Sequence, residues 1–459
     1  MKNLTMLKSI NPVTNEIVKT YQKHSEEGVE KIINSVDKIW HHWRSTSFHH
    51  RGQLMQNAAS ILRSKKEELA LLMAQEMGKV KSEGIAEIEK CAWVCEYYAA
   101  NAEAFLENET IATQARKSYV SYQPIGTILA VMPWNFPFWQ VFRFAAPTLM
   151  AGNTAVLKHA SNVPGCSMAI EEIFREAGFP ENVFRSLLIG SPMVEKVIKH
   201  KAIKGVSLTG STPAGKSVAA LAGAELKKCV LELGGSDPYL ILKDADLEMA
   251  AKKCAAGRLL NAGQSCIGAK RFIVVEEVYA HFLELFTYEM NAAHFGDPFD
   301  EESTMGPMAR EDLRDELHQQ VVDSVNKGAE IIIGGEIPHR KGAFYPPTIL
   351  ENVKPGMPAY EEELFGPVAS VIKVKDQEEA IRVANDTDFG LGAAVFTQNI
   401  KKGEHIAEIE LEAGACFVND FVKSDPRLPF GGIKTSGFGR ELSVQGIKEF
   451  MNVKTVFVK

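Results

Sequence analysis

The feature that most constrains the fold of this chain is an alternation of short apolar runs and helix-length segments that begins after Gly126. The apolar runs have the composition of strands and lie at 127–132, 154–157, 184–188, 205–208 and 229–233. Segments of helix length, such as 165–176 and 213–224, separate them. Strands that alternate with helices at short spacing are typical of a parallel sheet with helices on both faces.

A second series of strand-like runs follows Gly234 and Gly235, at 239–242, 271–275, 330–333 and 369–374. Upstream of the first series, residues 25–107 have apolar side chains at helical spacing, as in Val29, Ile33 and Val36. The sequence therefore predicts an α/β fold of two doubly wound α/β domains, joined near Gly234 and preceded by a helical layer.

The charge balance excludes several classes of partner. Lys and Arg number 51 and Asp and Glu 58, which gives a net charge of −7 over 459 residues. A nucleic-acid surface or an anchor on an anionic membrane needs a basic patch that this balance does not indicate. The apolar stretch at 136–152 contains Arg143 and two prolines, so no transmembrane helix is expected. The N-terminus has no apolar signal segment, and we expect a cytoplasmic protein.

The seven cysteines form an odd, scattered set without paired metal-ligand spacing. We expect reduced thiols and no metal site. Cys91 and Cys95 lie on one face of a predicted helix, where small core residues are the expected role.

The segment Gly210–Ser217 follows a predicted strand, precedes a predicted helix and matches the phosphate-binding pattern GxxxxGK[ST]. One interpretation is the P-loop of an ATPase. The other is a strand-to-helix turn whose amides bind the pyrophosphate of a dinucleotide. The residues of this segment alone do not decide between them.

Two further residues indicate chemistry. Glu232 stands inside an apolar strand just before a Gly pair, where a carboxylate is costly without a role or a partner. Cys266 ends the polar turn Asn261-Ala-Gly-Gln-Ser-Cys266, where access and nearby amides would favour a reactive thiolate. Either residue alone would more commonly be structural.

These residues belong to a set of motifs that occurs in one order along the chain. The motifs are Met132-Pro-Trp134-Asn135-Phe-Pro, Leu157-Lys158, Thr209-Gly210-Ser211-Thr, Leu231-Glu232-Leu-Gly-Gly, Gly263-Gln-Ser-Cys266, Glu363-Leu-Phe365-Gly-Pro and Pro429-Phe-Gly-Gly-Ile-Lys-Thr-Ser-Gly437. In them the chain resembles the NAD(P)-dependent aldehyde dehydrogenases over nearly its whole length. The resemblance implies that the cofactor pyrophosphate lies at Gly210 and Ser211, and that Lys216 is a surface residue.

The resemblance also implies a mechanism. Cys266 would add to the aldehyde carbon, and the oxyanion would accept hydrogen bonds from the Asn135 side chain and the Cys266 backbone N–H. Hydride would then pass to the nicotinamide and leave a thioester, and Glu232 would be the general base for its hydrolysis.

For the cofactor, the resemblance implies that Lys158 binds the adenosine ribose and Glu363 the nicotinamide ribose, beside Phe365 and Trp134. Relatives commonly carry Pro-x-Glu after this lysine, and the Glu binds the ribose 2′-hydroxyl. This chain has His159-Ala-Ser161 instead. Without that carboxylate a 2′-phosphate is not repelled, so both NAD and NADP are expected.

For the substrate, Arg143 stands where succinate-semialdehyde dehydrogenases hold the substrate carboxylate, and Ser424 occupies the place of a helping serine. The alternative role for Arg143 is an arginine whose head reaches solvent. Many such enzymes have a second arginine six residues before the nucleophile, and this chain has Leu260 at that position. The resemblance favours succinate semialdehyde as substrate. An aldehyde dehydrogenase for neutral or aromatic aldehydes is the alternative, followed by a P-loop ATPase and a non-catalytic relative.

The family architecture also implies domain boundaries. Residues 1–106 and 124–233 are expected to form the dinucleotide-binding domain and residues 234–433 the catalytic domain. Strand-like runs at 119–122 and 453–458 lie outside both, and the segments 107–123 and 434–459 are expected to form a β arm that joins subunits of a homodimer or homotetramer.

Overall fold

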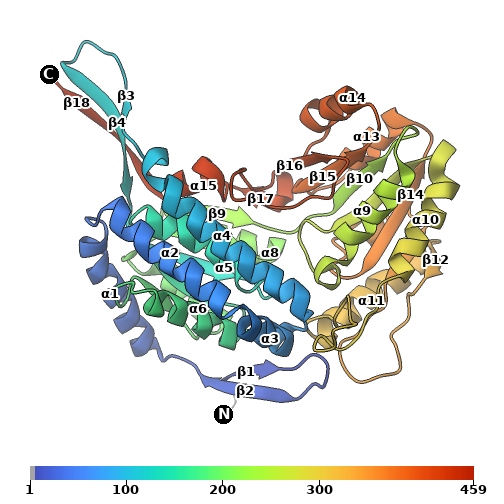
Figure 1. Ribbon diagram of the computed structural model, residues 1–459, viewed down its shortest axis with the longest axis horizontal. Coiled ribbons are helices and arrows are strands. Elements are labelled where there is room, and N and C mark those ends of the chain that lie inside the picture. Colours follow the sequence, from blue (N-terminus) through green and yellow to red (C-terminus); the bar gives the residue numbers. More distant parts are fainter. Residues whose placement is uncertain (1–5) are drawn as a thin grey trace.

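The computed structural model describes residues 6–459. A strand pair, β1 (Met6–Ile10) and β2 (Ile17–Gln22), precedes the helical layer. The layer consists of α1 (Glu26–Trp43), α2 (Phe48–Ser64), α3 (Lys66–Met77) and α4 (Lys81–Phe105). It packs beside the first sheet in Figure 1, which confirms the predicted helical opening.

The first sheet has the strand order β17-β9-β8-β5-β6-β7. Its strands are β5 (Thr127–Met132), β6 (Thr154–His159), β7 (Phe184–Ser186), β8 (Ile203–Thr209), β9 (Lys228–Glu232) and β17 (Gly437–Phe438). Its helices are α5 (Trp139–Met150), α6 (Pro164–Glu176), α7 (Val194–Lys199) and α8 (Thr212–Ala224). Strands β5 to β9 pair in parallel, and β17 adds an antiparallel edge.

The second sheet has the order β12-β13-β14-β11-β10-β15-β16 and is parallel except for β12. Its strands are β10 (Asp237–Ile241), β11 (Ala269–Val275), β12 (Glu330–Ile333), β13 (Thr348–Glu351), β14 (Val368–Val374), β15 (Gly392–Phe396) and β16 (Ala415–Val418). Its helices are α9 (Leu247–Leu259), α10 (Tyr279–Asn291), α11 (Glu311–Asn326), α12 (Pro358–Glu361), α13 (Gln377–Asn385) and α14 (Ile400–His405). Strands β13, β15 and β16 were not predicted from the sequence.

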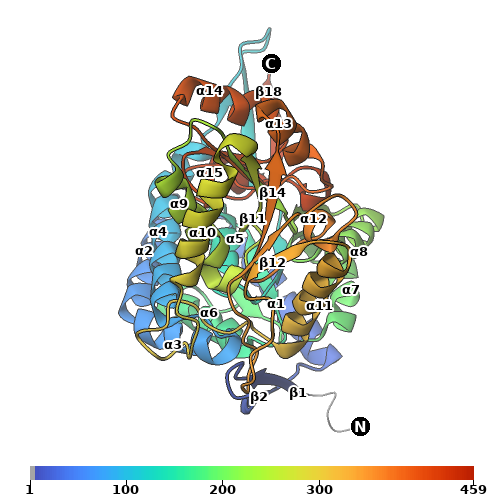
Figure 2. The same cartoon turned by 90° about the vertical axis from the view of Figure 1, so that its right-hand side faces the viewer.

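Burial on both faces explains why these strands read as apolar runs. Along β11, Phe272 and Val274 belong to one core, and Ile273 and Val275 belong to the core on the other face. Successive side chains of a strand point to opposite faces, so helices must cover both. Figure 2 shows α9 and α10 on one side of β11 and β14, and α11 on the other. The predicted α/β class is confirmed.

A three-stranded sheet projects from the body of the molecule as the β arm (Figure 1). It consists of β3 (Glu109–Thr110), β4 (Lys117–Pro124) and β18 (Met451–Val458), and a short helix, α15 (Ser443–Lys448), leads into β18. Strands β4 and β18 pair antiparallel along their whole length. Within the described residues, no helix is long and apolar enough to cross a membrane.

Candidate active site

Cys266 lies on a tight turn between α9 and β11, where the backbone is left-handed. Asn261, Ala262 and Gly263 have φ values of 56°, 52° and 71° in succession. A Cβ on Gly263 would lie 2.1 Å from the Gly366 carbonyl oxygen, so only glycine fits there. A left-handed alanine is strained, and strain of this kind is concentrated at functional sites.

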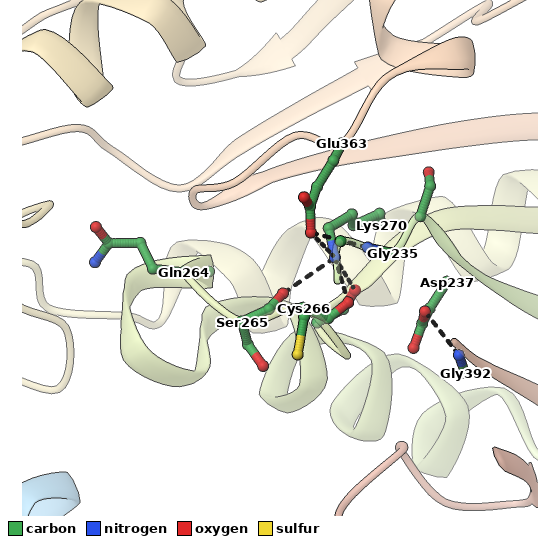
Figure 3. A network of polar contacts seen from close by, with 12 residues as sticks. Gly235, Asp237, Gln264, Ser265, Cys266, Lys270, Glu363 and Gly392 are labelled. Carbon is green, nitrogen blue, oxygen red and sulfur yellow. Dashed lines mark hydrogen bonds and ion pairs between the residues drawn. The ribbon is translucent and has the colours of Figure 1, made fainter. Parts of the chain in front are cut away.

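Lys270 holds this turn from inside. Its Nζ donates hydrogen bonds to the carbonyl oxygens of Ser265, Cys266 and Gly268, at 3.0 to 3.1 Å. The same Nζ lies 3.7 Å from Glu363 Oε1 (Figure 3). The three bonds fix the backbone on both sides of the sulfur, which is the preorganisation that a nucleophile requires.

Asn135 reaches the same turn from the end of β5. Its Nδ2 donates to the Gln264 backbone carbonyl oxygen at 3.0 Å, and the backbone carbonyl oxygen of Asn135 accepts from Asn261 Nδ2 at 2.8 Å. One of the two amide hydrogens is therefore used to orient the group, and the other remains for a ligand oxygen. The structure brings Asn135 to the nucleophile turn, as a donor to an oxyanion requires.

Glu232 is the last residue of β9, 2 % exposed, and neither carboxylate oxygen has a hydrogen-bond partner among the described residues. Burial, and secondarily Glu441, raise the pKa of Glu232 well above its usual range. A carboxylate with a raised pKa is a stronger base than an exposed one. A Cβ on Gly431 would lie 2.7 Å from Glu232 Oε1, which explains a glycine in the motif that begins at Pro429.

Burial sets the pKa of the Cys266 thiol. Burial raises the pKa of its thiol to about 12, and the nearby Arg143 and Lys270 charges only partly oppose this. Desolvation of the sulfur therefore outweighs the effect of its positive neighbours on this pKa, which favours the thiol in the ligand-free protein. A thiol with this pKa has to lose its proton before the sulfur can add to a carbonyl carbon.

This pKa predicts how Cys266 reacts with iodoacetamide when no ligand is added. Only the thiolate reacts, so the alkylation rate should rise about tenfold per pH unit between pH 7 and pH 9. Mass spectrometry of the Cys266 peptide measures the rate, and Cys266→Ala identifies that peptide. A rate that is constant over this interval would show that the thiolate already exists at neutral pH.

Two separate cavities reach Cys266. The first, about 280 Å³, is lined by Trp134, Asn135, Thr209, Gly210, Ser211, Gly234, Cys266, Glu363 and Phe365, among others. The second, about 230 Å³, is lined by Lys90, Phe136, Trp139, Arg143, Cys266, Ser424 and Phe430, among others. Two reactants can therefore approach one sulfur by separate routes.

The first cavity fits a dinucleotide. Helix α8 begins at its wall with no side-chain cap on its first turn, and such uncapped amides attract a pyrophosphate. The rings of Trp134 and Phe365 meet edge to face at 5.9 Å. Glu363 Oε1 accepts from the Gly235 N–H at 3.0 Å (Figure 3). Burial raises the Glu363 pKa.

The predicted adenosine end lies at the end of β6. Lys158 is 8 % exposed, and its Nζ has no hydrogen bond or ion pair with any residue of the described range 6–459. Burial lowers its pKa. A buried lysine without a partner fits a ligand that supplies acceptors, such as ribose hydroxyls. Ser161 is exposed just beyond it, and Lys216 is exposed on α8.

Arg143 lies in the wall of the second cavity and is 1 % exposed, so the alternative in which its head reaches solvent is wrong. Its Nε forms an ion pair with Glu441, and its Nη2 donates to Thr209 Oγ1 at 3.2 Å. Its guanidinium carbon lies 4.7 Å from the centre of the Phe430 ring. Ser424 accepts a hydrogen bond from Lys90 Nζ at 2.8 Å.

Three site residues escaped the sequence analysis: Lys90, Lys270 and Glu441. Lys270 and its neighbour Arg271 are charged residues in the otherwise apolar strand β11, a signal that could have found them. Glu441 follows the motif that ends at Gly437, and its partner Arg143 lies far from it in the sequence, on α5. No sequence signal distinguishes Lys90 from the other lysines of an amphipathic helix.

Comparison with known proteins agrees with this geometry. Residues 1–456 match the aldehyde dehydrogenase family. A protein of Synechocystis sp. named "Probable succinate-semialdehyde dehydrogenase", with NADP(+) given in its name, is 48 % identical over 98 % of this chain and 99 % of its own. The Escherichia coli "Succinate semialdehyde dehydrogenase" Sad, named for NAD(P)+, is 45 % identical over 98 % of this chain and 97 % of its own.

A solved structure, a succinic semialdehyde dehydrogenase from Streptococcus pyogenes in complex with NADP+, superposes with a TM-score of 0.96. It is 39 % identical and covers 98 % of this chain and 99 % of its own. A P-loop ATPase is therefore the wrong interpretation of Gly210–Ser217, whose lysine is exposed on α8. The motifs, the nucleophile turn with its two cavities and these matches together place the chain in the aldehyde dehydrogenase family.

Proposed function

We propose that this enzyme oxidises succinate semialdehyde to succinate with NADP+ or NAD+. The observation that carries the proposal is the convergence of two cavities on Cys266, one suited to a dinucleotide and one with cations in its wall. The names of the most similar relatives support the same substrate.

In the proposed reaction, the Cys266 thiol loses its proton to solvent, the sulfur forms a bond to the aldehyde carbon, and the carbonyl π electrons move to the oxygen. The second Asn135 amide hydrogen and the Cys266 backbone N–H donate to this oxyanion; one such donor is typically worth about 100- to 1,000-fold in rate. NAD(P)+, held by the residues of the first cavity, would supply the acceptor for the hydride that this adduct loses. The product on Cys266 is a thioester.

Glu232 completes the cycle by taking a proton from a water molecule that attacks the thioester carbonyl. The C–S bond then breaks, the carboxylic acid leaves, and the proton on Glu232 passes to the Cys266 sulfur, which regenerates the thiol and the carboxylate. The raised pKa of Glu232 and its two unpartnered oxygens support this role. Arg143 Nη1 donates to no described residue, so Arg143 and Ser424 are proposed to contact the substrate carboxylate.

The substrate is tested by initial rates over a panel of aldehydes with each cofactor. We expect succinate semialdehyde to have a higher kcat/KM than butanal, which has the same number of carbons and no carboxylate, and than benzaldehyde. Equal or higher values for the neutral aldehydes would instead support a general aldehyde dehydrogenase.

A second prediction concerns cofactor choice. Ser161 lies beyond the carboxyl end of β6, where parallel sheets bind dinucleotides. His159 does not supply positive charge there, because burial lowers its pKa to about 4. Ser161→Glu should lower kcat/KM for NADP by about tenfold or more through repulsion of the 2′-phosphate, and affect NAD much less.

Ser161→Ala is the uncharged control for this experiment and should leave the NADP to NAD ratio near that of the wild type. An unchanged NADP efficiency in Ser161→Glu would show that this position does not face the ribose.

We further propose that the β arm joins subunits of a homodimer or homotetramer. The cofactor domain would consist of residues 1–106 and 124–233, and the catalytic domain of residues 234–433. The enzyme is proposed to be cytoplasmic. Val453 and Phe457 lie on one face of β18 and are 61 % and 52 % exposed. Exposed apolar residues on an unpaired strand edge are a liability for a monomer.

Light scattering should therefore give a mass of two or four chains for the wild type. The double substitution Val453→Asp and Phe457→Asp should lower that mass. Leu226→Asp, which removes an apolar residue that is 96 % exposed outside the β arm, is the matched control and should not. A monomeric wild-type mass contradicts the assignment of the arm.

A further inference from the structure

The second cavity contains a cation that has no acidic partner. Lys90, on α4, donates from Nζ to Ser424 Oγ at 2.8 Å, and the same nitrogen lies 4.3 Å from the centre of the Trp139 ring. No carboxylate oxygen among residues 6–459 lies within 4.0 Å of it. Both of its neighbours are uncharged, so neither neutralises the ammonium group.

The other charged groups of this cavity and its rim already have partners. The pairs are Arg143 with Glu441, Lys423 with Asp420, Glu87 with Lys79, Asp425 with Arg427, and Glu83 with the backbone N–H of Asn261. Burial also raises the pKa of Glu83 to about 7, which reduces its negative charge at neutral pH. Lys90 is therefore the uncompensated positive charge among the described residues that line this cavity.

The surroundings of Lys90 make this charge costly. Burial, and secondarily the like charge of Arg143, lower the pKa of Lys90 to about 8. The amine is therefore still largely protonated at pH 7. Aromatic side chains of Phe136, Trp139 and Phe430 form much of the wall, so an incoming anion would meet a poorly solvated cation. Such a cation gains more from a counter-ion than an exposed lysine does.

We propose that Lys90, together with Ser424, binds the carboxylate of the substrate and provides the net charge by which this enzyme selects a semialdehyde acid over a neutral aldehyde. Arg143 then contributes a hydrogen bond from Nη1, because Glu441 already balances its charge. The inference rests on the proposed function, since it requires a substrate with a carboxylate. Ser424 fixes the direction of the ammonium group before the substrate arrives.

The test compares variants that keep or remove the charge at position 90. Lys90→Gln retains a hydrogen-bond donor without the charge, Lys90→Met is a second uncharged variant, and Lys90→Arg keeps the charge. KM is measured for succinate semialdehyde and for butanal, and succinate is tested as an inhibitor. The uncharged variants should raise KM for the semialdehyde and the inhibition constant of succinate by about tenfold or more, with a much smaller change for butanal.

For Lys90→Arg, KM for succinate semialdehyde and the inhibition constant of succinate should both stay within a few-fold of the wild-type values. Lys423→Gln is the matched control, because Lys423 lines the same cavity but is exposed and paired with Asp420 at 2.7 Å. It should change neither constant.

The outcomes separate this inference from the proposed function. A wild-type enzyme that does not prefer the semialdehyde to butanal contradicts the proposed function itself. If the wild type has that preference and the uncharged variants keep it, the function stands and the role of Lys90 is overturned. Equal increases in KM for both aldehydes would make Lys90 a structural residue and would also overturn it.

Discussion

Cys266→Ala is expected to abolish dehydrogenase activity, with a loss on the order of 10³-fold or more, because Cys266 is the residue that the cofactor cavity and the second cavity share. Cofactor binding should remain close to that of the wild type. Lys270 holds the nucleophile turn through backbone carbonyls, which the substitution leaves in place. Steady-state rates measure the loss, and fluorescence titration with NADPH measures the binding.

Cys416→Ala is the control for this substitution. Cys416 is another partly buried free thiol, on β16 in the second sheet, and its replacement should leave activity intact. A Cys266→Ala variant that retained a substantial part of the wild-type rate would remove Cys266 from the mechanism.

Glu232→Gln is expected to stop the reaction after the first half. The substitution keeps the shape of the side chain, and no hydrogen bond of Glu232 is lost, because neither oxygen has a partner among the described residues. Adduct formation and cofactor reduction should proceed once, and hydrolysis should slow by about 10²- to 10⁴-fold without the general base. Stopped-flow absorbance should show a burst of about one NADPH per active site, followed by slow turnover.

An experiment with hydroxylamine distinguishes the loss of the general base from general damage to the active site. This nucleophile attacks a thioester without a general base, so it should restore turnover of Glu232→Gln and yield a hydroxamate. A variant with wild-type turnover, or one without a burst and without rescue, contradicts the role of Glu232 as the base for hydrolysis.

Many elements of the fold follow from local sequence. The run at 127–132 is β5 with the same bounds, and α6 and α8 begin within one residue of the predicted helices. A proline in the first turn marks the start of each of these helices.

Strand β15, Gly-Ala-Ala-Val-Phe, was missed because its residues are mostly small and carry little strand preference of their own. It forms a strand because β10 and β16 pair with it on either side.

The sequence by itself predicted the nucleophile and its base, because Cys266, Glu232 and Asn135 stand in short motifs that can be recognised without the fold. Only the tertiary structure decided which charged groups around these residues are paired and which are not. The ion pair of Arg143 with Glu441 leaves Lys90 as the unbalanced cation, and these residues lie on segments far apart in the chain. Burial likewise raises the pKa of the Cys266 thiol, and this effect depends on the whole fold around the sulfur.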